Sequence, residues 1–384
     1  MNHRRTILVA ALAAALCAVA AGTASARTAA WPRTTVATGL DSPRALTFSP
    51  SGDLLVAEGG HGGDVCRPMG ALGDHCIGLT SRITKVDTGS GALTPLASGL
   101  FSSSLGMEGI TGVDGVAASG GKLYATMTGA HQQYDTWSCT NQPADCAAVV
   151  AAAKAQAGRL EHVSNGGTVQ PLADVGGHDF DLVLADPSLS SEGPNANPYG
   201  LFAEPMGIWV ADAGANVLDW ITNDGSIAVS SRIPKNAPGG FPGDGVPTCV
   251  AVLRGHLYAA DLSGRLWERS GSFDPTQVAL GGVHHFTGCV SDGLDHLYLV
   301  DMWGTPGPPI PAGPQSAAAS GAVIEFDRKT GTATTIASGL DFPNGIALAK
   351  DGSLYVSVGS TCTATGTPFP YCAKGGGIVR LAQS

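Results

Sequence analysis

The sequence predicts an all-β fold, a six-bladed β-propeller, from three observations. A pattern of four short strands recurs along the chain, the composition is rich in turn-forming residues, and a strand near the start can complete the last repeat. The chain has 384 residues, with 54 glycines, 24 prolines and 14% charged residues. This composition excludes a coiled coil or an all-helical bundle.

A short motif, Leu-Tyr-Val or a close variant, recurs along the chain and marks the second strand of each repeat. The other strands are placed relative to it. These second strands are expected at 54–58, 123–127, 208–212, 257–261, 297–301 and 354–358. First strands open near Pro43, Val113, Pro198, Pro247, Thr287 and Pro343. Third strands follow at 83–86, 160–163, 217–221, 266–269, 323–326 and 378–381. Each kind of strand therefore occurs six times.

The two ends of the chain are expected to close the ring. Fourth strands of the pattern Thr-x-x-x-Ala-Ser-Gly-Leu are clearest at 93–100 and 332–340, but the sixth repeat reaches Ser384 without one. Residues 35–40 match 334–340 and can supply the missing outer strand. Such closure removes open sheet edges. We expect a single propeller domain over 27–384.

The first 26 residues are typical of a secretory signal peptide. Arg4 and Arg5 give a positive start, 6–22 is apolar, and Ala24-Ser25-Ala26 fits a cleavage site. We expect a secreted, extracellular or periplasmic protein after cleavage near Ala26, with Cys17 removed alongside the signal.

The charge of the mature chain argues against two classes of partner. The full chain carries 21 basic and 31 acidic residues, so loss of two arginines with the signal leaves a formal charge of about −12. This excess of acid disfavours nucleic acid and anionic membrane surfaces as partners. No later run is long enough to cross a bilayer as a helix.

Loop lengths distinguish the two faces of the predicted ring. Links from strand one to two and from three to four share one face and are short, as at 50–53, 164–167, 222–225 and 350–352. The links on the other face, here called the insertion face, are long: 59–81, 129–158, 174–197, 234–246, 303–320 and 359–376. A helix is expected at 143–157, with Pro143 at its start. Long loops are usually functional or disordered, so a ligand or partner is expected on the insertion face.

Eight cysteines remain after removal of the signal, which favours disulfides in an exported chain. Three pairs fall inside single insertions: Cys66 with Cys76, Cys139 with Cys146, and Cys362 with Cys372. Cys249 and Cys289 occupy matching positions on the first strands of neighbouring blades, where a bridge is geometrically feasible. Eight cysteines allow 105 pairings, so spacing alone leaves other connectivities open.

The candidate ligand site is the mouth of the central channel on the insertion face. The residues that enter the first strands gather there: Arg44, Asp114, Tyr199, Thr248, Gly288 and Asn344. A ring of polar groups around a narrow concave mouth is the default ligand site of such a fold. The alternative for Asp114 and Asn344, each of which precedes a glycine, is that they cap turns.

Other polar residues have weaker claims to a site. The acids that end second strands are expected to bond backbone amides in adjoining loops: Glu58, Asp212, Asp261 and Asp301. Two histidine groups are weak metal candidates that lack a firm third ligand: His178 with Asp179 and Asp181, and His284 with His285. The sequence contains no H-E-x-x-H, G-x-S-x-G, P-loop or EF-hand motif.

Several runs resemble the ScyD/ScyE family of exported propellers. They are Asn197-Pro198-Tyr199-Gly200-Leu201, 210–214, Val246-Pro247-Thr248, 261–264, 39–46 and 55–59. The resemblance implies a six-bladed propeller related to NHL-repeat proteins, located outside the cytoplasm, and implies no catalytic residues. Asp114-Gly115 and Asn344-Gly345 are also similar to motifs with which gluconolactonase-type propellers hold a divalent cation, although their order along the chain differs.

Two classes of function are compatible with these residues. The first is a binding module that takes a small molecule or a protein partner at the channel mouth. The alternative is an enzyme: a metal-assisted lactone or ester hydrolase that holds a divalent cation with Asp114 and Asn344, or an oxidative enzyme acting on an aromatic metabolite.

Overall fold

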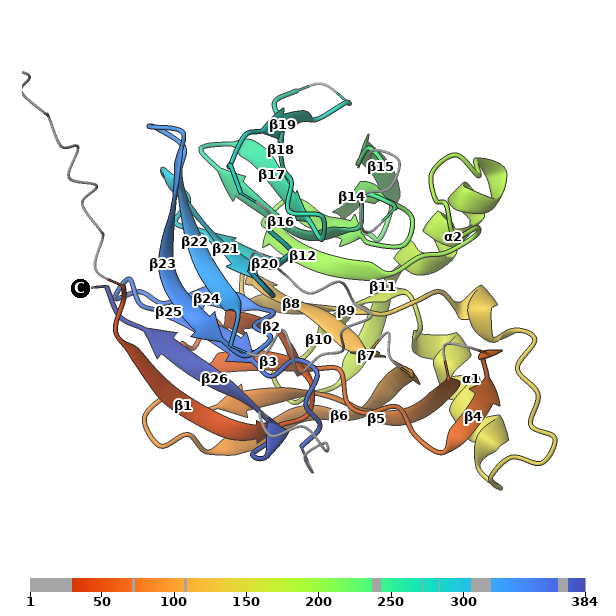
Figure 1. Ribbon diagram of the computed structural model, residues 1–384. Coiled ribbons are helices and arrows are strands. Elements are labelled where there is room, and N and C mark those ends of the chain that lie inside the picture. The colour runs from red at the N-terminus through yellow and green to blue at the C-terminus, as the bar shows by residue number, and fades with distance from the viewer. Residues whose placement is uncertain are drawn as a thin grey trace, which may run out of the picture.

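The structure, a computed structural model, describes residues 30–70, 73–106, 109–236, 243–271, 273–282, 284–304, 319–364 and 372–383. Its strands form six antiparallel sheets arranged in a ring, which confirms the six-bladed β-propeller (Figure 1). The predicted signal segment and Cys17 lie outside the described residues. Within the described part of the chain, no helix is long and apolar enough to cross a membrane.

The first three blades each contain the predicted four strands. Blade 1 consists of β2 (Pro43–Phe48), β3 (Leu54–Glu58), β5 (Asp74–Val86) and β6 (Leu93–Leu105), with short additions β4 (Val65–Pro68) and β7 (Gly109–Thr111). Blade 2 consists of β8 (Val113–Ser119), β9 (Lys122–Met127), β10 (Arg159–Val163) and β11 (Val169–Asp174). Blade 3 consists of β12 (Pro198–Glu204), β13 (Gly207–Asp212), β14 (Val217–Thr222) and β15 (Ile227–Arg232).

The last three blades repeat this order, and the sixth uses both ends of the chain. Blade 4 consists of β16 (Pro247–Leu253), β17 (His256–Asp261), β18 (Leu266–Arg269) and β19 (Thr276–Val278). Blade 5 consists of β20 (Phe286–Ser291), β21 (His296–Asp301), β22 (Gly321–Asp327) and β23 (Thr332–Leu340). Blade 6 consists of β24 (Ile346–Leu348), β25 (Leu354–Val358), β26 (Gly376–Leu381) and β1 (Arg33–Leu40).

Closure of the ring follows the predicted pairing of β1 with β26. The two strands are antiparallel, with Thr35 opposite Val379 and Thr38 opposite Gly377. The backbone N–H of Trp31, just before β1, donates to the carbonyl oxygen of Ile336 in blade 5, at 2.9 Å. The first strand of the chain is thus held by two blades.

The central residues of the second strands are mostly apolar because both faces of a blade are covered by neighbouring blades. Every residue of β3 is buried. Leu54 and Val56 pack with blade 6, whereas Leu55 and Ala57 pack with blade 2. Side chains alternate across a strand, so a strand between two blades needs apolar residues at successive positions.

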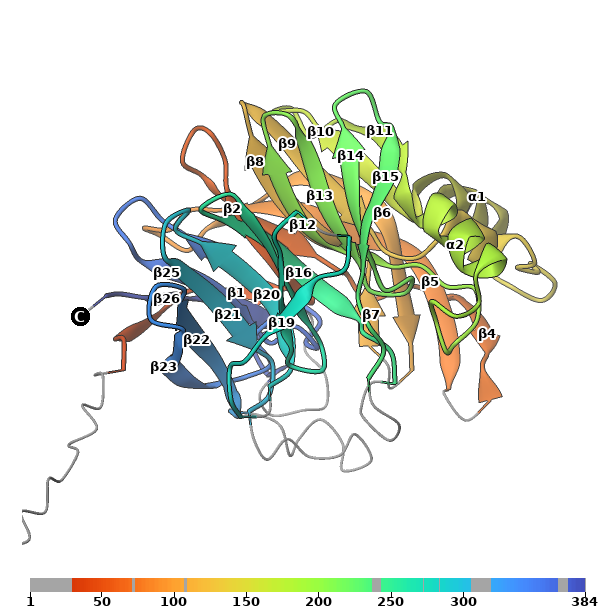
Figure 2. The same cartoon turned by 90° about the horizontal axis from the view of Figure 1, so that it is seen from above.

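The insertions contain more regular structure than the sequence indicated. The segment 59–81, expected to be a loop, carries β4 and the first half of β5. Helix α1 (Cys146–Gln156) begins three residues after Pro143, behind Asp145. A second helix, α2 (Val175–Ala185), was not expected, and the side chain of Asp174 accepts a hydrogen bond from the backbone of Gly177 at its start. Figure 2 shows both helices on the same side of the ring.

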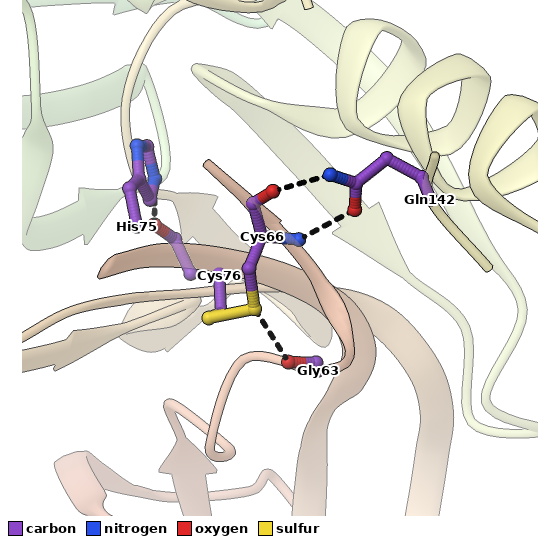
Figure 3. The surroundings of a disulfide bond; sticks show 6 residues. Gly63, Cys66, His75, Cys76 and Gln142 are labelled. Carbon is purple, nitrogen blue, oxygen red and sulfur yellow. Dashed lines mark hydrogen bonds between the residues drawn. A yellow bond between two sulfur atoms is a disulfide. The ribbon is translucent and has the colours of Figure 1, made fainter. Parts of the chain in front are cut away.

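All four predicted disulfides are present. Their pairs are Cys66–Cys76, Cys139–Cys146, Cys249–Cys289 and Cys362–Cys372. The first joins β4 to β5, and Gln142 from the blade 2 insertion accepts a hydrogen bond from the Cys66 N–H at 3.0 Å and donates one to its carbonyl at 2.6 Å (Figure 3). The insertion of one blade is thereby fastened to the next.

Candidate functional site

The inner strands of the six blades surround a narrow central cavity. Strands β2, β8, β12, β16 and β20 lie around the centre of the ring in Figure 1. The cavity has a volume of about 50 Å³, and its lining includes four of the predicted residues: Asp114, Tyr199, Thr248 and Asn344. Gly288 also lines it, whereas Arg44 reaches it through contacts with two of these side chains.

Glycines at the start of the inner strands bring the blades close enough to form this mouth. A Cβ atom added to Gly115, Gly200, Gly288 or Gly345 would lie within 3.0 Å of a backbone oxygen of the next blade. The oxygens that would be struck belong to Tyr199, Thr248, Asn344 and Arg44, in that order. Close packing of the blades is therefore one reason for glycine at these four positions.

Arg44 and Asp114 form a buried ion pair at the mouth. Arg44 is 7% exposed and Asp114 is 1% exposed. The Nε atom of Arg44 lies 3.7 Å from Oδ1 of Asp114, and its guanidinium also donates to the carbonyl oxygen of Ile110. The distance between these two atoms is too long for a hydrogen bond, so the charges attract while Nε of Arg44 remains without a hydrogen-bond partner in the described structure.

Tyr199 joins the Arg44 side of the mouth to blade 6. Its hydroxyl oxygen accepts a hydrogen bond from Nδ2 of Asn344 at 2.7 Å and a longer one from Arg44 at 3.4 Å. A phenol oxygen has two lone pairs and one hydrogen. Because both lone pairs are engaged, the phenol hydrogen is left for donation.

Asp114 is the least satisfied polar group of the mouth. Neither of its carboxylate oxygens, nor Nε of Arg44, has a hydrogen-bond partner in the described structure. Burial raises the pKa of Asp114 to about 6, and the positive charge of Arg44, together with weak contacts from the Gly112 backbone and the Thr128 side chain, opposes that rise only in part. The mouth therefore holds a carboxyl group that changes charge near neutral pH.

Thr248 contributes differently from the other predicted residues. Its hydroxyl donates to the carbonyl oxygen of Phe286 in blade 5, at 2.7 Å. Thr287 makes an equivalent bond to the carbonyl oxygen of Asn344 in blade 6, at 3.1 Å. Since its hydrogen is used between blades, Thr248 can offer a ligand only acceptor lone pairs.

The remaining polar candidates mostly serve the fold. The acids that end second strands accept hydrogen bonds from backbone amides, as predicted, and their donors are Asp41 for Glu58, Ala215 for Asp212, Arg265 for Asp261 and His285 for Asp301. His284 bonds Asp301 through Nδ1 at 2.9 Å, which raises the pKa of the imidazole.

The histidine and aspartates of the blade 2–3 link form a different cluster from the one predicted. His178 and Asp179 meet Asp219 of β14, and the end of β13 brings Asp212 beside them. Asp181 instead accepts a hydrogen bond from Gln132 at 3.3 Å. Asp219 was missed because it lies within a predicted core strand; its charge among apolar neighbours was the available signal.

Comparison with known proteins supports the architecture. A profile for the family described as strictosidine synthase matches residues 315–365, less than half of the chain. The fold is similar to that of a gluconolactonase from Xanthomonas campestris, at 11% identity over 91% of this chain and 88% of that one, with a TM-score of 0.52. It is also similar to a protein of unknown function from Bacteroides thetaiotaomicron, at 10% identity over 91% and 75% of the two chains, with a TM-score of 0.53. No curated protein sequence matches.

Proposed function

We propose that the protein is an exported propeller that binds a small molecule by taking one hydroxyl-bearing end of it into the channel mouth. The observation that carries this proposal is the buried carboxylate of Asp114, which lines the cavity and, apart from weak contacts with the Gly112 backbone and the Thr128 side chain, has no hydrogen-bond partner in the described structure. A buried carboxylate without partners costs free energy. A ligand that donates a hydrogen bond to this carboxylate would offset that cost.

The donors and acceptors of the mouth select the chemistry of that ligand. A hydroxyl group can donate to Asp114 and accept from the phenol of Tyr199 at the same time. A carboxylate would lack the hydrogen and repel Asp114, whereas an ammonium group would face the guanidinium of Arg44. The arrangement therefore fits sugars, sugar lactones or phenols better than charged metabolites.

The size of the cavity limits how much of the ligand enters. Its volume is about 50 Å³, and one water molecule needs about 10–15 Å³ by the same kind of measure. A hydroxymethyl-sized group fits, so the rest of the ligand would lie over the insertion face. A protein partner presenting a serine or tyrosine there would use the same contacts.

Export is part of this proposal. Four disulfides are typical of proteins from oxidising compartments. The signal-peptide features of residues 1–26 and the resemblance to the ScyD/ScyE family support the same location.

A hydrolase is the second candidate, and the pKa of Asp114 favours it. A carboxyl group with a pKa of about 6 can accept or donate a proton near neutral pH, with Tyr199 beside it as a hydrogen-bond donor. A lactone or ester of a hydroxyl compound is then a natural substrate. A metal-assisted hydrolase is less favoured, because Arg44 already places a positive charge 3.7 Å from Asp114, where the cation would bind. No feature of the described mouth favours an oxidative enzyme.

Calorimetric titration with sugars, sugar lactones and phenols tests both candidates. We expect Asp114→Asn and Tyr199→Phe to weaken binding by about tenfold or more, the loss of roughly one hydrogen bond to a charged or buried group. Lys122→Ala is the matched control, since Lys122 is exposed at the opposite end of the same blade.

The outcomes separate the candidates. Binding without turnover supports the binding module. Hydrolysis with an inflection near pH 6 that Asp114→Asn abolishes supports the enzyme. Wild-type affinity in both mouth variants contradicts both candidates.

A further inference from the structure

A second group of acids lies away from the channel mouth, where the blade 2–3 link meets blade 3. His178 and Asp179 lie in the first two turns of α2, Asp212 ends β13, and Asp219 lies within β14. The three aspartates are fully buried, at 0% exposure each. His178, Asp179 and Asp219 each offer one possible ligand atom, and these three atoms lie within 4.8 Å of one another.

These aspartates lack the partners that other buried acids of the protein have. Apart from the contacts that Asp179 makes with Asp212 and Asp219, both oxygens of Asp219 and one oxygen each of Asp179 and Asp212 have no hydrogen-bond partner in the described structure. The other oxygen of Asp212 accepts from the amides of Asn197, Gly214 and Ala215, at 2.8–2.9 Å. That bonding fixes the Asp212 carboxylate and leaves its free oxygen beside the other two acids.

The local negative charge has little basic compensation. Among the described residues, the basic group in contact with these aspartates is His178, whose Nδ1 lies 2.8 Å from Oδ1 of Asp179. Three carboxylates in a water-poor site cannot all stay ionised without a counter-charge. Either protons or a cation must supply it.

We propose that His178, Asp179, Asp219 and the free oxygen of Asp212 bind one divalent transition-metal cation, Mn²⁺ or Zn²⁺. Carboxylate oxygens suit Mn²⁺ and imidazole suits Zn²⁺, whereas Ca²⁺ and Mg²⁺ favour ligand sets made of oxygen alone. Two ligands at about 2.1 Å from an ion and at right angles to each other are about 3 Å apart. The separation of 2.8 Å between His178 and Asp179 is close to that spacing.

The position of the cluster indicates that a bound ion would stabilise the contact of α2 with β13 and β14 of blade 3. The His178 side chain is 39% exposed, so an ion can reach the site from solvent. None of the four residues lines the channel mouth. The site is therefore independent of the proposed ligand binding.

Metal content and thermal melting of the purified mature protein test this proposal. After removal of metal with chelator and dialysis against micromolar Mn²⁺ or Zn²⁺, we expect one ion per chain by elemental analysis. At an ion concentration about a hundredfold above Kd, we expect Tm to rise by about 4 °C for a chain of this length. A protein without bound ion, whose Tm is the same in chelator and in metal, overturns the proposal and assigns the counter-charge to shared protons.

Two variants and a control identify the ligands. Asp219→Asn and Asp179→Asn should lose the ion and its Tm rise, yet in chelator they should melt no lower than the wild type, since each removes one buried like charge. Asp181→Asn is the control: it lies on the same helix, is exposed, and should keep both the ion and the Tm rise. Wild-type metal content in both ligand variants would contradict the assignment, and the wild-type measurement decides the proposal even if one variant fails to fold.

Discussion

Burial of Asp114 ties the chemistry of the mouth to the stability of the fold. The pKa of this carboxyl rises from 3.8 to about 6 because the carboxylate loses water, and Arg44, Gly112 and Thr128 replace that solvation only in part. The folded chain therefore binds the Asp114 proton more tightly than the unfolded chain does. Asp114 destabilises the folded protein above pH 6 and has no such effect below its unfolded pKa.

This linkage predicts how Asp114→Asn changes stability with pH. Relative to the wild type, the variant should gain free energy of unfolding as pH rises from about 4 to about 6, reaching about 2–3 kcal/mol at neutral pH. Guanidinium unfolding of both proteins at about pH 4 and about pH 7.5 measures the difference. A variant that loses the same stability at both pH values would show that the Asp114 carboxylate is well solvated or well paired.

At the residue scale the sequence predicted the members of the mouth but not their contacts. Asp114, Tyr199 and Asn344 each enter the first strand of a repeat. Because first strands line the central channel of a propeller, assignment of the repeats is enough to predict that these residues converge. The reason for the glycines after Asp114 and Asn344 could not be predicted, because the atoms that exclude a Cβ belong to the next blade. Asp219 was missed because it lies within a predicted core strand, and the acid and histidine that neighbour it come from a helix about forty residues earlier in the chain.

At the element scale, prediction worked where the local pattern and the packing agree. Second strands such as β3 and β17 are apolar runs because two blades cover them. Helix α2 was missed because Gly176 and Gly177 disfavour a helix locally. Its buried residues Val175 and Val183 hold it in place, so tertiary packing overrides the local preference.

The disulfides offer a prediction at this scale, because their loops differ in length. The bridge Cys249–Cys289 spans 40 residues and joins blades 4 and 5, whereas Cys139–Cys146 spans 7. On loop-closure entropy, replacing both cysteines of the long bridge by serine should cost about 4 kcal/mol, against about 2.5 kcal/mol for the short one. Guanidinium unfolding of the two double variants measures this order. A larger loss from the short bridge would contradict the loop-length argument.

At the scale of the whole molecule, closure of the ring depends on one strand. The repeat count and the match of 35–40 to 334–340 were enough to predict it, because an open sixth blade would leave an edge exposed. The predicted pairing of this strand with the last repeat is confirmed, and the structure adds its register, with Thr35 opposite Val379. The order of strands in the ring was therefore more predictable than the structure of the long links on the insertion face.

Removal of β1 should open the ring. A chain that starts at Asp41 exposes the edge of β26, so we expect a lower Tm, self-association, and faster amide exchange at Ile378 and Val379. A chain that starts at Ala30 keeps β1 and serves as the control. Unchanged exchange at β26 in the shorter chain would show that β1 does not seal the blade.

The central claim is that side chains from several blades form one ligand site at the channel mouth. The most direct test is a crystal structure of the protein with the tightest-binding hydroxyl compound from the titration panel. We predict a ligand oxygen within about 3 Å of both the Asp114 carboxylate and the Tyr199 hydroxyl. A ligand ordered elsewhere on the molecule, with Asp114 and Tyr199 contacting only water, would contradict the account.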